Sequence, residues 1–131
     1  MAAGQYTFTI EQGTTVDFRI EYTDAINVPI DLTDYHARMQ IRPTFGGVIH
    51  AELSSSLHFD GTGLNMTPLS GSLVLPKSSG SIQIYISAAT TSMFTFDTAR
   101  YDIEIVSGSA TNDYVKRILE GKIKLKKEIT I

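Results

Sequence analysis

The chain of 131 residues contains no cysteine. This absence excludes disulfide bonds, thiolate metal ligands and cysteine nucleophiles together. A protein of this composition can be made in a reducing cytoplasm and can work outside it, because its fold does not depend on the redox state of the surroundings.

Long apolar runs are also missing. No stretch approaches the roughly 20 continuous apolar residues that span a bilayer, so we expect no membrane association. Residues 1–5 contain neither a basic region nor an apolar region, and we therefore expect no signal peptide. We expect these five residues to form a flexible N-terminal tail.

Charged residues are also few, and neither sign strongly exceeds the other. The chain has 14 acidic and 11 basic residues, which gives a net charge of −3, and only 19% of its residues are charged. A net charge this small does not imply electrostatic steering toward a nucleic acid or an anionic membrane. We therefore do not expect a nucleic acid as a partner.

Alternation of apolar and polar residues is the feature that the chain has in abundance. Tyr101, Ile103 and Ile105 fall on one face of a segment whose other face carries Asp102 and Glu104. Strict period-two alternation marks strands that are buried on one side only. The same pattern predicts strands over residues 6–10, 16–22, 35–42 and 81–87.

The C-terminal region predicts an antiparallel meander of three strands. These strands cover residues 100–106, 114–120 and 122–131, with turns at 107–112 and at Gly121. Elsewhere, Gly46 and Gly47 predict a hairpin, a further short strand is expected at 73–75, and residues 57–59 or 64–66 could form brief strands. One short helical turn is expected over 87–94, with Ser87 as its N-cap.

Short strands separated by turn residues every 8–12 residues are typical of a β-sandwich. The length suits one domain with a single core, and no linker or repeat divides the chain. We therefore predict an all-β protein whose residues 1–131 form a single antiparallel β-sandwich domain with one short helical turn.

The residues that most often bind metals do not form a known ligand pattern. The three histidines are far apart, and four aspartates near one end of the predicted sandwich do not match a calcium-binding loop. Aspartate in turns usually accepts local backbone hydrogen bonds, so we predict no metal site. The residues considered are His36, His50, His58, Asp17, Asp24, Asp31 and Asp34.

Motifs for catalysis are not found either. The serines form no nucleophile elbow, and the glycines form neither a phosphate-binding loop nor a dinucleotide fingerprint. The carboxylates of Asp102 and Glu104 share one strand face, where alternating charge usually serves solvation. We predict no catalytic residues, no cofactor and no enzymatic activity.

Three candidate contact features remain. Lys122, Lys124 and Lys126 form a basic stripe, which could contact phosphate or could protect an edge strand from aggregation; we favour the edge strand. Edge strands can also pair with the sheet of a neighbouring protein. Tyr85 lies opposite Ile84 and Ile86 in register, and we predict an exposed contact aromatic there. The predicted assembly edge strands contain Tyr6, Phe8 and Ile10 at one end of the chain and Lys122, Lys124 and Lys126 at the other.

Several segments carry a resemblance to a known family. They read FTIEQG at 8–13, VPIDLT at 28–33, ARMQIR at 37–42, YDIEI at 101–105 and VKRILEG at 115–121. This pattern resembles the small immunoglobulin-like virion proteins of tailed bacteriophages, and it is similar to the N-terminal domain of upper baseplate proteins. The resemblance spans nearly the whole chain and implies an immunoglobulin-like sandwich.

The resemblance also implies a function. It predicts a structural subunit of the phage particle, placed in the tail or baseplate, that attaches or cements other virion proteins through protein–protein contacts. The C-terminal extension that often follows such a domain in baseplate proteins is absent here, which favours an attachment subunit over a receptor-binding arm. We expect synthesis in the bacterial host cytoplasm, location in the virion, and homo-oligomers within a symmetric assembly.

Two alternatives stay open. One is a head or neck decoration protein of the same particle. The other is a module that binds a carbohydrate or the host surface, which would need two or more exposed aromatic residues on one face. The chain has no tryptophan, and Tyr85 is the one plausible exposed aromatic residue, so this alternative is less favoured.

Overall fold

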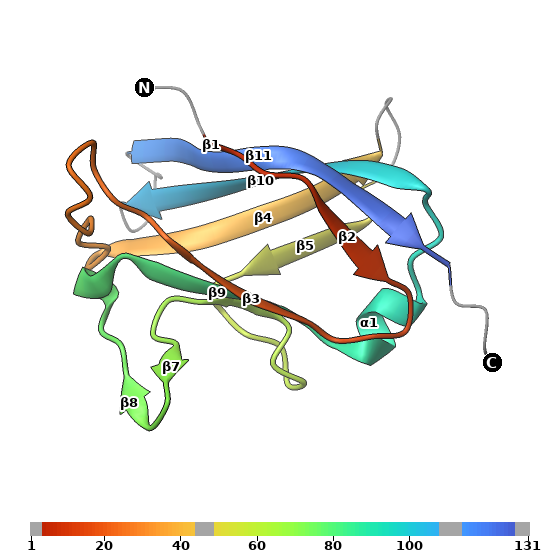
Figure 1. Cartoon of the computed structure of the whole chain (residues 1–131), viewed down its shortest axis with the longest axis horizontal. Coiled ribbons are helices and arrows are strands. Elements are labelled where there is room, and N and C mark those ends of the chain that lie inside the picture. The colour runs from red at the N-terminus through yellow and green to blue at the C-terminus, as the bar shows by residue number, and fades with distance from the viewer. Residues whose placement is uncertain (1–3, 44–48, 108–113, 128–131) are drawn as a thin grey trace.

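Two β-sheets packed face to face form the body of the described part of the chain, and a separate two-stranded sheet projects from it (Figure 1). The structure is a computed structural model that describes residues 4–43, 49–107 and 114–127. Sheet A has the strand order β1-β11-β10-β4-β5, with β2 also paired to β11, and sheet B has the order β3-β9-β6. This arrangement confirms the predicted all-β sandwich.

The strands are β1 (Gly4–Gln5), β2 (Phe8–Glu11), β3 (Val16–Glu21), β4 (Tyr35–Pro43), β5 (Ala51–Ser54), β6 (Gly63–Asn65), β7 (Leu69–Ser70), β8 (Leu73–Val74), β9 (Ser81–Ile86), β10 (Thr98–Ser107) and β11 (Tyr114–Lys126). Two short helices are present, η1 (Lys77–Ser79) and α1 (Ala88–Ser92). The Ser87 side chain accepts a hydrogen bond from the backbone N–H of Thr90, which confirms the predicted N-cap and short helical turn. Neither helix is long and apolar enough to cross a membrane, as far as the chain is described.

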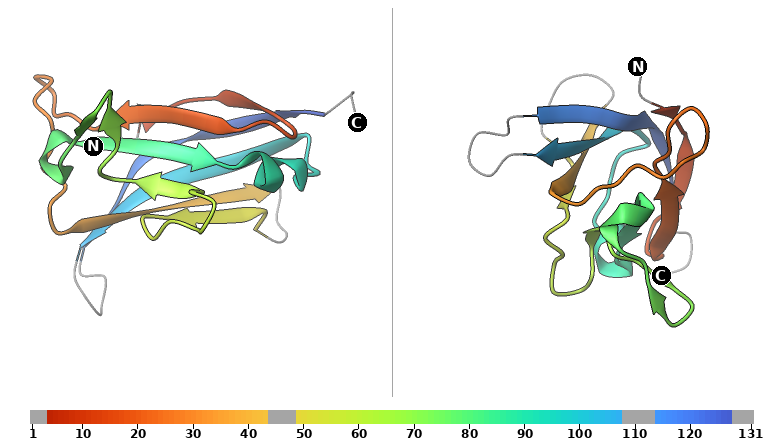
Figure 2. Two further views of the ribbon diagram at one scale, coloured as in Figure 1. Left: turned by 90° about the horizontal axis from the view of Figure 1, so that it is seen from below. Right: turned by 90° about the vertical axis from the view of Figure 1, so that its left-hand side faces the viewer.

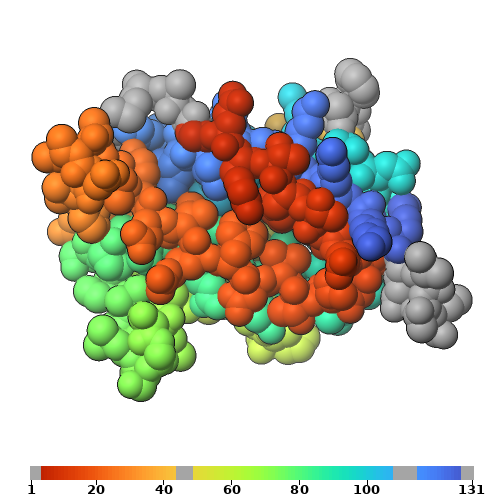
Figure 3. Space-filling view, viewed as in Figure 1, coloured from red at the N-terminus to blue at the C-terminus, as the bar shows by residue number. Residues whose placement is uncertain are grey.

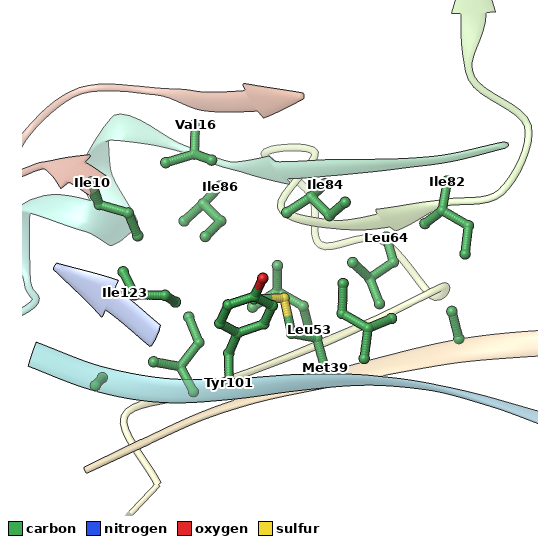
Figure 4. Packing of buried hydrophobic residues seen from close by; sticks show 14 of the residues in the cluster. Ile10, Val16, Met39, Leu53, Leu64, Ile82, Ile84, Ile86, Tyr101 and Ile123 are labelled. Atoms are coloured by element: carbon green, nitrogen blue, oxygen red, sulfur yellow. The ribbon is translucent and has the colours of Figure 1, made fainter. Parts of the chain in front are cut away.

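The core lies between the two sheets and is built from the apolar positions of the alternating strands. Ile82, Ile84 and Ile86 of β9 are fully buried and face Ile103 and other residues of sheet A. Burial of such side chains contributes about 1.5–3 kcal/mol each. Figure 4 shows Ile10, Val16, Met39, Leu53, Leu64, Ile82, Ile84, Ile86, Tyr101 and Ile123 in the space between the sheets.

The first two strands of the predicted C-terminal meander are confirmed, because β10 and β11 pair in antiparallel orientation. The predicted third strand is wrong, because β11 is one continuous strand through Gly121 (Figure 1, blue). Gly121 marks a close approach of backbone and not a turn. A Cβ atom at this position would lie 2.0 Å from the carbonyl oxygen of Tyr6. Glycine inside a strand often marks such an approach. Residues 128–131 of the prediction lie outside the described residues.

The N-terminal segment runs along β11. This path contradicts two predictions, the flexible tail at residues 1–5 and the purely antiparallel sheet. Gly4 and Gln5 are not part of a flexible tail but form β1, and both β1 and β2 pair with β11 in parallel. Backbone hydrogen bonds tie the segment to β11, including one of 3.0 Å from the N–H of Tyr6 to the carbonyl of Glu120. The sheet is therefore mixed, because the chain passes along β11 before it crosses to sheet B as β3.

Residues between β5 and β9 alternate short strands with turns. Strand β6 covers part of the predicted 64–66 segment, whereas residues 57–59 form no strand because a tight turn links His58 to Gly61. The predicted 73–75 strand is β8, which pairs with β7 in a hairpin that projects from the body of the sandwich (Figure 2, green). The predicted turn at Gly46 and Gly47 lies outside the described residues, although β4 and β5 are antiparallel.

Candidate binding surfaces

The outer face of sheet A carries three cations in one line across three strands. Arg100 of β10 is directly opposite Lys122 of β11 and also directly opposite Arg42 of β4. All three residues are exposed. We call Arg42, Arg100 and Lys122 the cation row. Like charges directly opposite each other on neighbouring strands are destabilising, so this arrangement has an energetic cost.

The nearest carboxylates are engaged by another arginine. Asp102 and Glu120 are cross-strand partners beside the cation row. Arg117 lies 3.5 Å from the Oδ2 atom of Asp102 and 3.6 Å from the Oε2 atom of Glu120. Partial burial raises the pKa of Asp102, while Arg117 and, to a smaller extent, Arg42 of the cation row act in the opposite direction. In the part of the chain that the structure describes, no carboxylate lies within 4.0 Å of a cation-row nitrogen.

The cation row borders an open depression on this face. Its volume is about 560 Å³, and Gln5 and Thr7 of the N-terminal segment contribute to its wall together with Arg117. The Nε atom of Arg42 donates a hydrogen bond of 2.9 Å to the side-chain oxygen of Gln40, which holds that guanidinium at the rim. The depression therefore combines a concave shape with an excess of positive charge.

The first predicted edge strand is an edge in the structure. Strand β2 pairs with β11 on one side, and no other pairing is found for it among the described residues. Ile10 is buried, Phe8 is half-buried and packs against Phe18 at 5.1 Å between ring centroids, and Tyr6 is 50% exposed. The predicted role of Tyr6, Phe8 and Ile10 in assembly stays a prediction.

The second predicted edge strand is not an edge. Lys122, Lys124 and Lys126 belong to β11, which lies between β10 on one side and β1 and β2 on the other. The prediction failed because alternation reveals which face a side chain occupies but not how many neighbours a strand has. The three lysines are exposed on the outer face of sheet A, so edge protection does not explain them.

Tyr85 lies on the outward face of β9, the central strand of sheet B, as predicted. Its ring is half-buried because Gly61 lies against it. A Cβ atom at Gly61 would be 3.3 Å from the Cε1 atom of Tyr85. The prediction of an exposed aromatic residue at Tyr85 is therefore wrong, and the exposed aromatic residues of the described chain are Phe59 and Tyr6. The role of Tyr85 as a contact residue stays a prediction.

Two of the four aspartates considered as calcium ligands, Asp24 and Asp31, serve local turns, and Asp17 accepts a hydrogen bond from Gln83 on the neighbouring strand. The Oδ1 atom of Asp24 accepts hydrogen bonds of 3.0 Å from the N–H groups of Ile26 and Val28. Hydrogen bonds from the side chain and the backbone N–H of Thr33 lower the pKa of Asp31. Within residues 4–43, 49–107 and 114–127, no group of three or more His, Cys, Asp or Glu side chains is placed to hold a metal ion.

An apolar surface that the sequence reasoning missed lies on the β7–β8 hairpin. Leu69, Leu73 and Val74 are 63%, 63% and 57% exposed. A two-residue loop joins the strands, and Gly71 occupies its first position with a φ of 63°. Glycine at that position is typical of a tight hairpin turn. The sequence Leu-Ser-Gly-Ser-Leu-Val at 69–74 could have predicted this hairpin, because a glycine lies at its centre between apolar residues.

Comparison with protein-family models and with curated proteins finds no match to this chain. The resemblance to small virion proteins of tailed phages therefore stays a prediction from the sequence.

Proposed function

We propose that the protein is a non-enzymatic structural subunit of a tailed-phage particle, and that it attaches or cements other proteins of the tail or baseplate. The observation that carries this proposal is the apolar β7–β8 hairpin, which projects from the sandwich (Figure 3, green). Leu69 and Val74 are cross-strand partners on one face of the hairpin, and Leu73 lies on the other face. Adjoining apolar side chains that protrude into water mark protein–protein contacts. The sequence resemblance to phage virion proteins supports the particle as the place of these contacts.

The hairpin is anchored at its base, which supports a role as a preformed contact. Each of its strands has only two residues, and an isolated hairpin of this size is marginal in water. The N–H of Leu75 donates a hydrogen bond of 2.8 Å to the carbonyl of Pro68, whose side chain is buried. A contact that is already ordered loses less conformational entropy when it binds.

A free sheet edge offers a second route to assembly. Strand β2 pairs on one side only among the described residues, and its outer backbone groups could accept a strand from a neighbouring protein. Tyr6 beside it is half exposed and stacks on Phe8, with 5.9 Å between ring centroids. An aromatic residue next to an open edge adds apolar contact area to such a pairing.

Incorporation of a hairpin variant into particles tests the proposal. A phage carrying Leu69→Ser, Leu73→Ser and Val74→Thr should produce particles that lack this protein, because the apolar contact is removed while the core stays intact. Quantitative mass spectrometry of purified particles measures the loss. Met93→Ser is the matched control, since Met93 is 78% exposed at the end of α1 and lies outside the hairpin.

Normal incorporation of the triple variant would contradict the hairpin as the contact. Absence of the wild-type protein from particles would contradict the structural role altogether. Unchanged thermal melting of the purified variant shows that any loss comes from the contact and not from unfolding.

A further inference from the structure

We infer that the depression on the outer face of sheet A binds carboxylate groups of an acidic protein segment. This inference goes beyond the proposed function and does not depend on it, because it rests on the cation row and not on the hairpin. Its residues come from β4, β10 and β11, which are three adjacent strands of one sheet.

The first argument is the excess of positive charge, since the depression is lined by more cations than carboxylates. Arg100 is flanked on both sides by cations in register, and Arg117 already engages the adjacent carboxylates of Asp102 and Glu120. Repulsion within the cation row would be relieved by a bound anion. A site that is unfavourable when empty and favourable when occupied is typical of a binding surface.

The second argument concerns the spacing of the charges. Neighbouring strands lie about 4.8 Å apart, so the row from Arg42 to Lys122 spans about 10 Å at the backbone. An extended peptide places side chains of one face about 7 Å apart. Long arginine and lysine side chains can therefore contact two carboxylates on one face of an extended acidic segment, and the arginine forks match carboxylates in a bidentate manner.

The third argument separates carboxylates from phosphates. Asp102 and Glu120 lie beside the cation row and would repel a phosphate dianion more strongly than a singly charged carboxylate. Gln5 and Thr7 add neutral polar groups to the wall of the depression, which can hydrogen-bond a peptide backbone.

Titration of the ¹⁵N-labelled full chain with a short polyglutamate peptide at low salt, followed by NMR, tests the inference. We expect saturable shifts that centre on Arg42, Arg100 and Lys122. Arg100→Gln should weaken binding about tenfold, because charge-assisted hydrogen bonds at the centre of the row are lost. Lys126→Gln is the matched control, since it removes one charge from the same face of β11 outside the depression and should change affinity by less than about twofold.

Three results would overturn the inference. They are the absence of saturable shifts, equal weakening by Arg100→Gln and Lys126→Gln, and tighter binding of inorganic phosphate than of the peptide in a parallel titration. Arg100 is exposed, so its variant should fold, and its spectrum without peptide checks this directly.

Discussion

Gly121 allows the N-terminal segment to lie against β11. The carbonyl oxygen of Tyr6 occupies the space that a side chain at Gly121 would fill. The same oxygen accepts a hydrogen bond of 2.5 Å from the hydroxyl of Tyr101, whose burial raises its pKa. The absence of a side chain at Gly121 therefore lets the Tyr6 carbonyl approach β11 and accept the hydrogen bond from Tyr101.

Gly121→Ala should lower the free energy of unfolding by about 3 kcal/mol, because its Cβ atom would force the backbone of Tyr6 away from β11. Chemical denaturation measures this change. Gly4→Ala is the control on the same edge, since its Cβ atom would meet Leu119 at an ordinary 3.5 Å. Equal stability of the two variants would contradict the close approach at Gly121.

Asp60 links the His58–Gly61 turn to α1. Its Oδ2 atom accepts a hydrogen bond of 2.7 Å from the Ser87 hydroxyl, and its Oδ1 atom accepts one of 3.0 Å from the N–H of Thr62. These hydrogen bonds favour the ionised carboxylate and lower the pKa of Asp60 below its usual value of 3.8. The unfolded chain consequently binds a proton at higher pH than the folded chain does.

The stability that Asp60 contributes should be complete above pH 3.8 and should be lost as the pH falls through the lowered pKa. Urea denaturation of the wild type and of Asp60→Asn across this range measures it. The variant should be less stable than the wild type above pH 3.8, and the difference should shrink below it. Asp34→Asn, a substitution at an exposed residue, is the control and should have the same free energy of unfolding as the wild type. A difference in stability between the wild type and Asp60→Asn that is constant with pH would contradict the account.

Arg100 should cost stability, because it lies between Arg42 and Lys122. Arg100→Gln should raise the free energy of unfolding by about 0.5 kcal/mol at low salt. The gain should vanish at about 1 M salt, where charges are screened within about 3 Å. Chemical denaturation at both salt concentrations measures the change in the free energy of unfolding, with Lys126→Gln as the control. A loss of stability in Arg100→Gln would contradict the repulsion between the three cations.

At the scale of elements, β11 is an interior strand although its sequence resembles an edge. It is hydrogen-bonded to β10 on one side and to β1 and β2 on the other. Interior strands exchange their amide hydrogens slowly, because both sides of the backbone are paired.

Peptides that cover residues 119–126 should therefore exchange as slowly as those of β10 and more slowly than those of β5, which is the opposite edge of sheet A. Hydrogen exchange followed by mass spectrometry measures this order. Exchange over 119–126 as fast as in the β7–β8 hairpin would show that the N-terminal segment does not pair with β11.

Local alternation predicted the central strands well. The predicted strands at 16–22, 35–42 and 81–87 end within one residue of β3, β4 and β9. Each of these strands has one buried face, so its period-two pattern is visible in the sequence. The path of the N-terminal segment could not be predicted in this way, because its parallel pairing depends on a backbone approach at Gly121 from more than a hundred residues away.

The candidate surfaces were harder to predict than the fold. Arg42, Arg100 and Lys122 come together only through the registers of three strands. Register depends on the packed core and on turn geometry, which no single segment reveals. The hairpin, in contrast, had a local signal in Gly71, which lies between Leu69 and the apolar pair Leu73 and Val74. Whether these side chains are exposed depends on how the hairpin projects from the sandwich.

At the scale of the whole molecule, three different surfaces are available to partners. The apolar hairpin belongs to neither of the two packed sheets, whereas the N-terminal segment that carries the free edge at β2 also contributes Gln5 and Thr7 to the depression on the outer face of sheet A. A subunit that attaches or cements other proteins contacts more than one neighbour, and distinct surfaces on one sandwich allow this. This arrangement supports the proposed role in a phage particle.

Immunogold electron microscopy of intact particles, with antibody against this protein, tests the central claim most directly. The account predicts gold confined to the tail end. Gold spread over the head would contradict the tail or baseplate placement and favour a decoration protein. Particles without label, in which mass spectrometry also detects no peptide of this chain, would contradict the structural role itself.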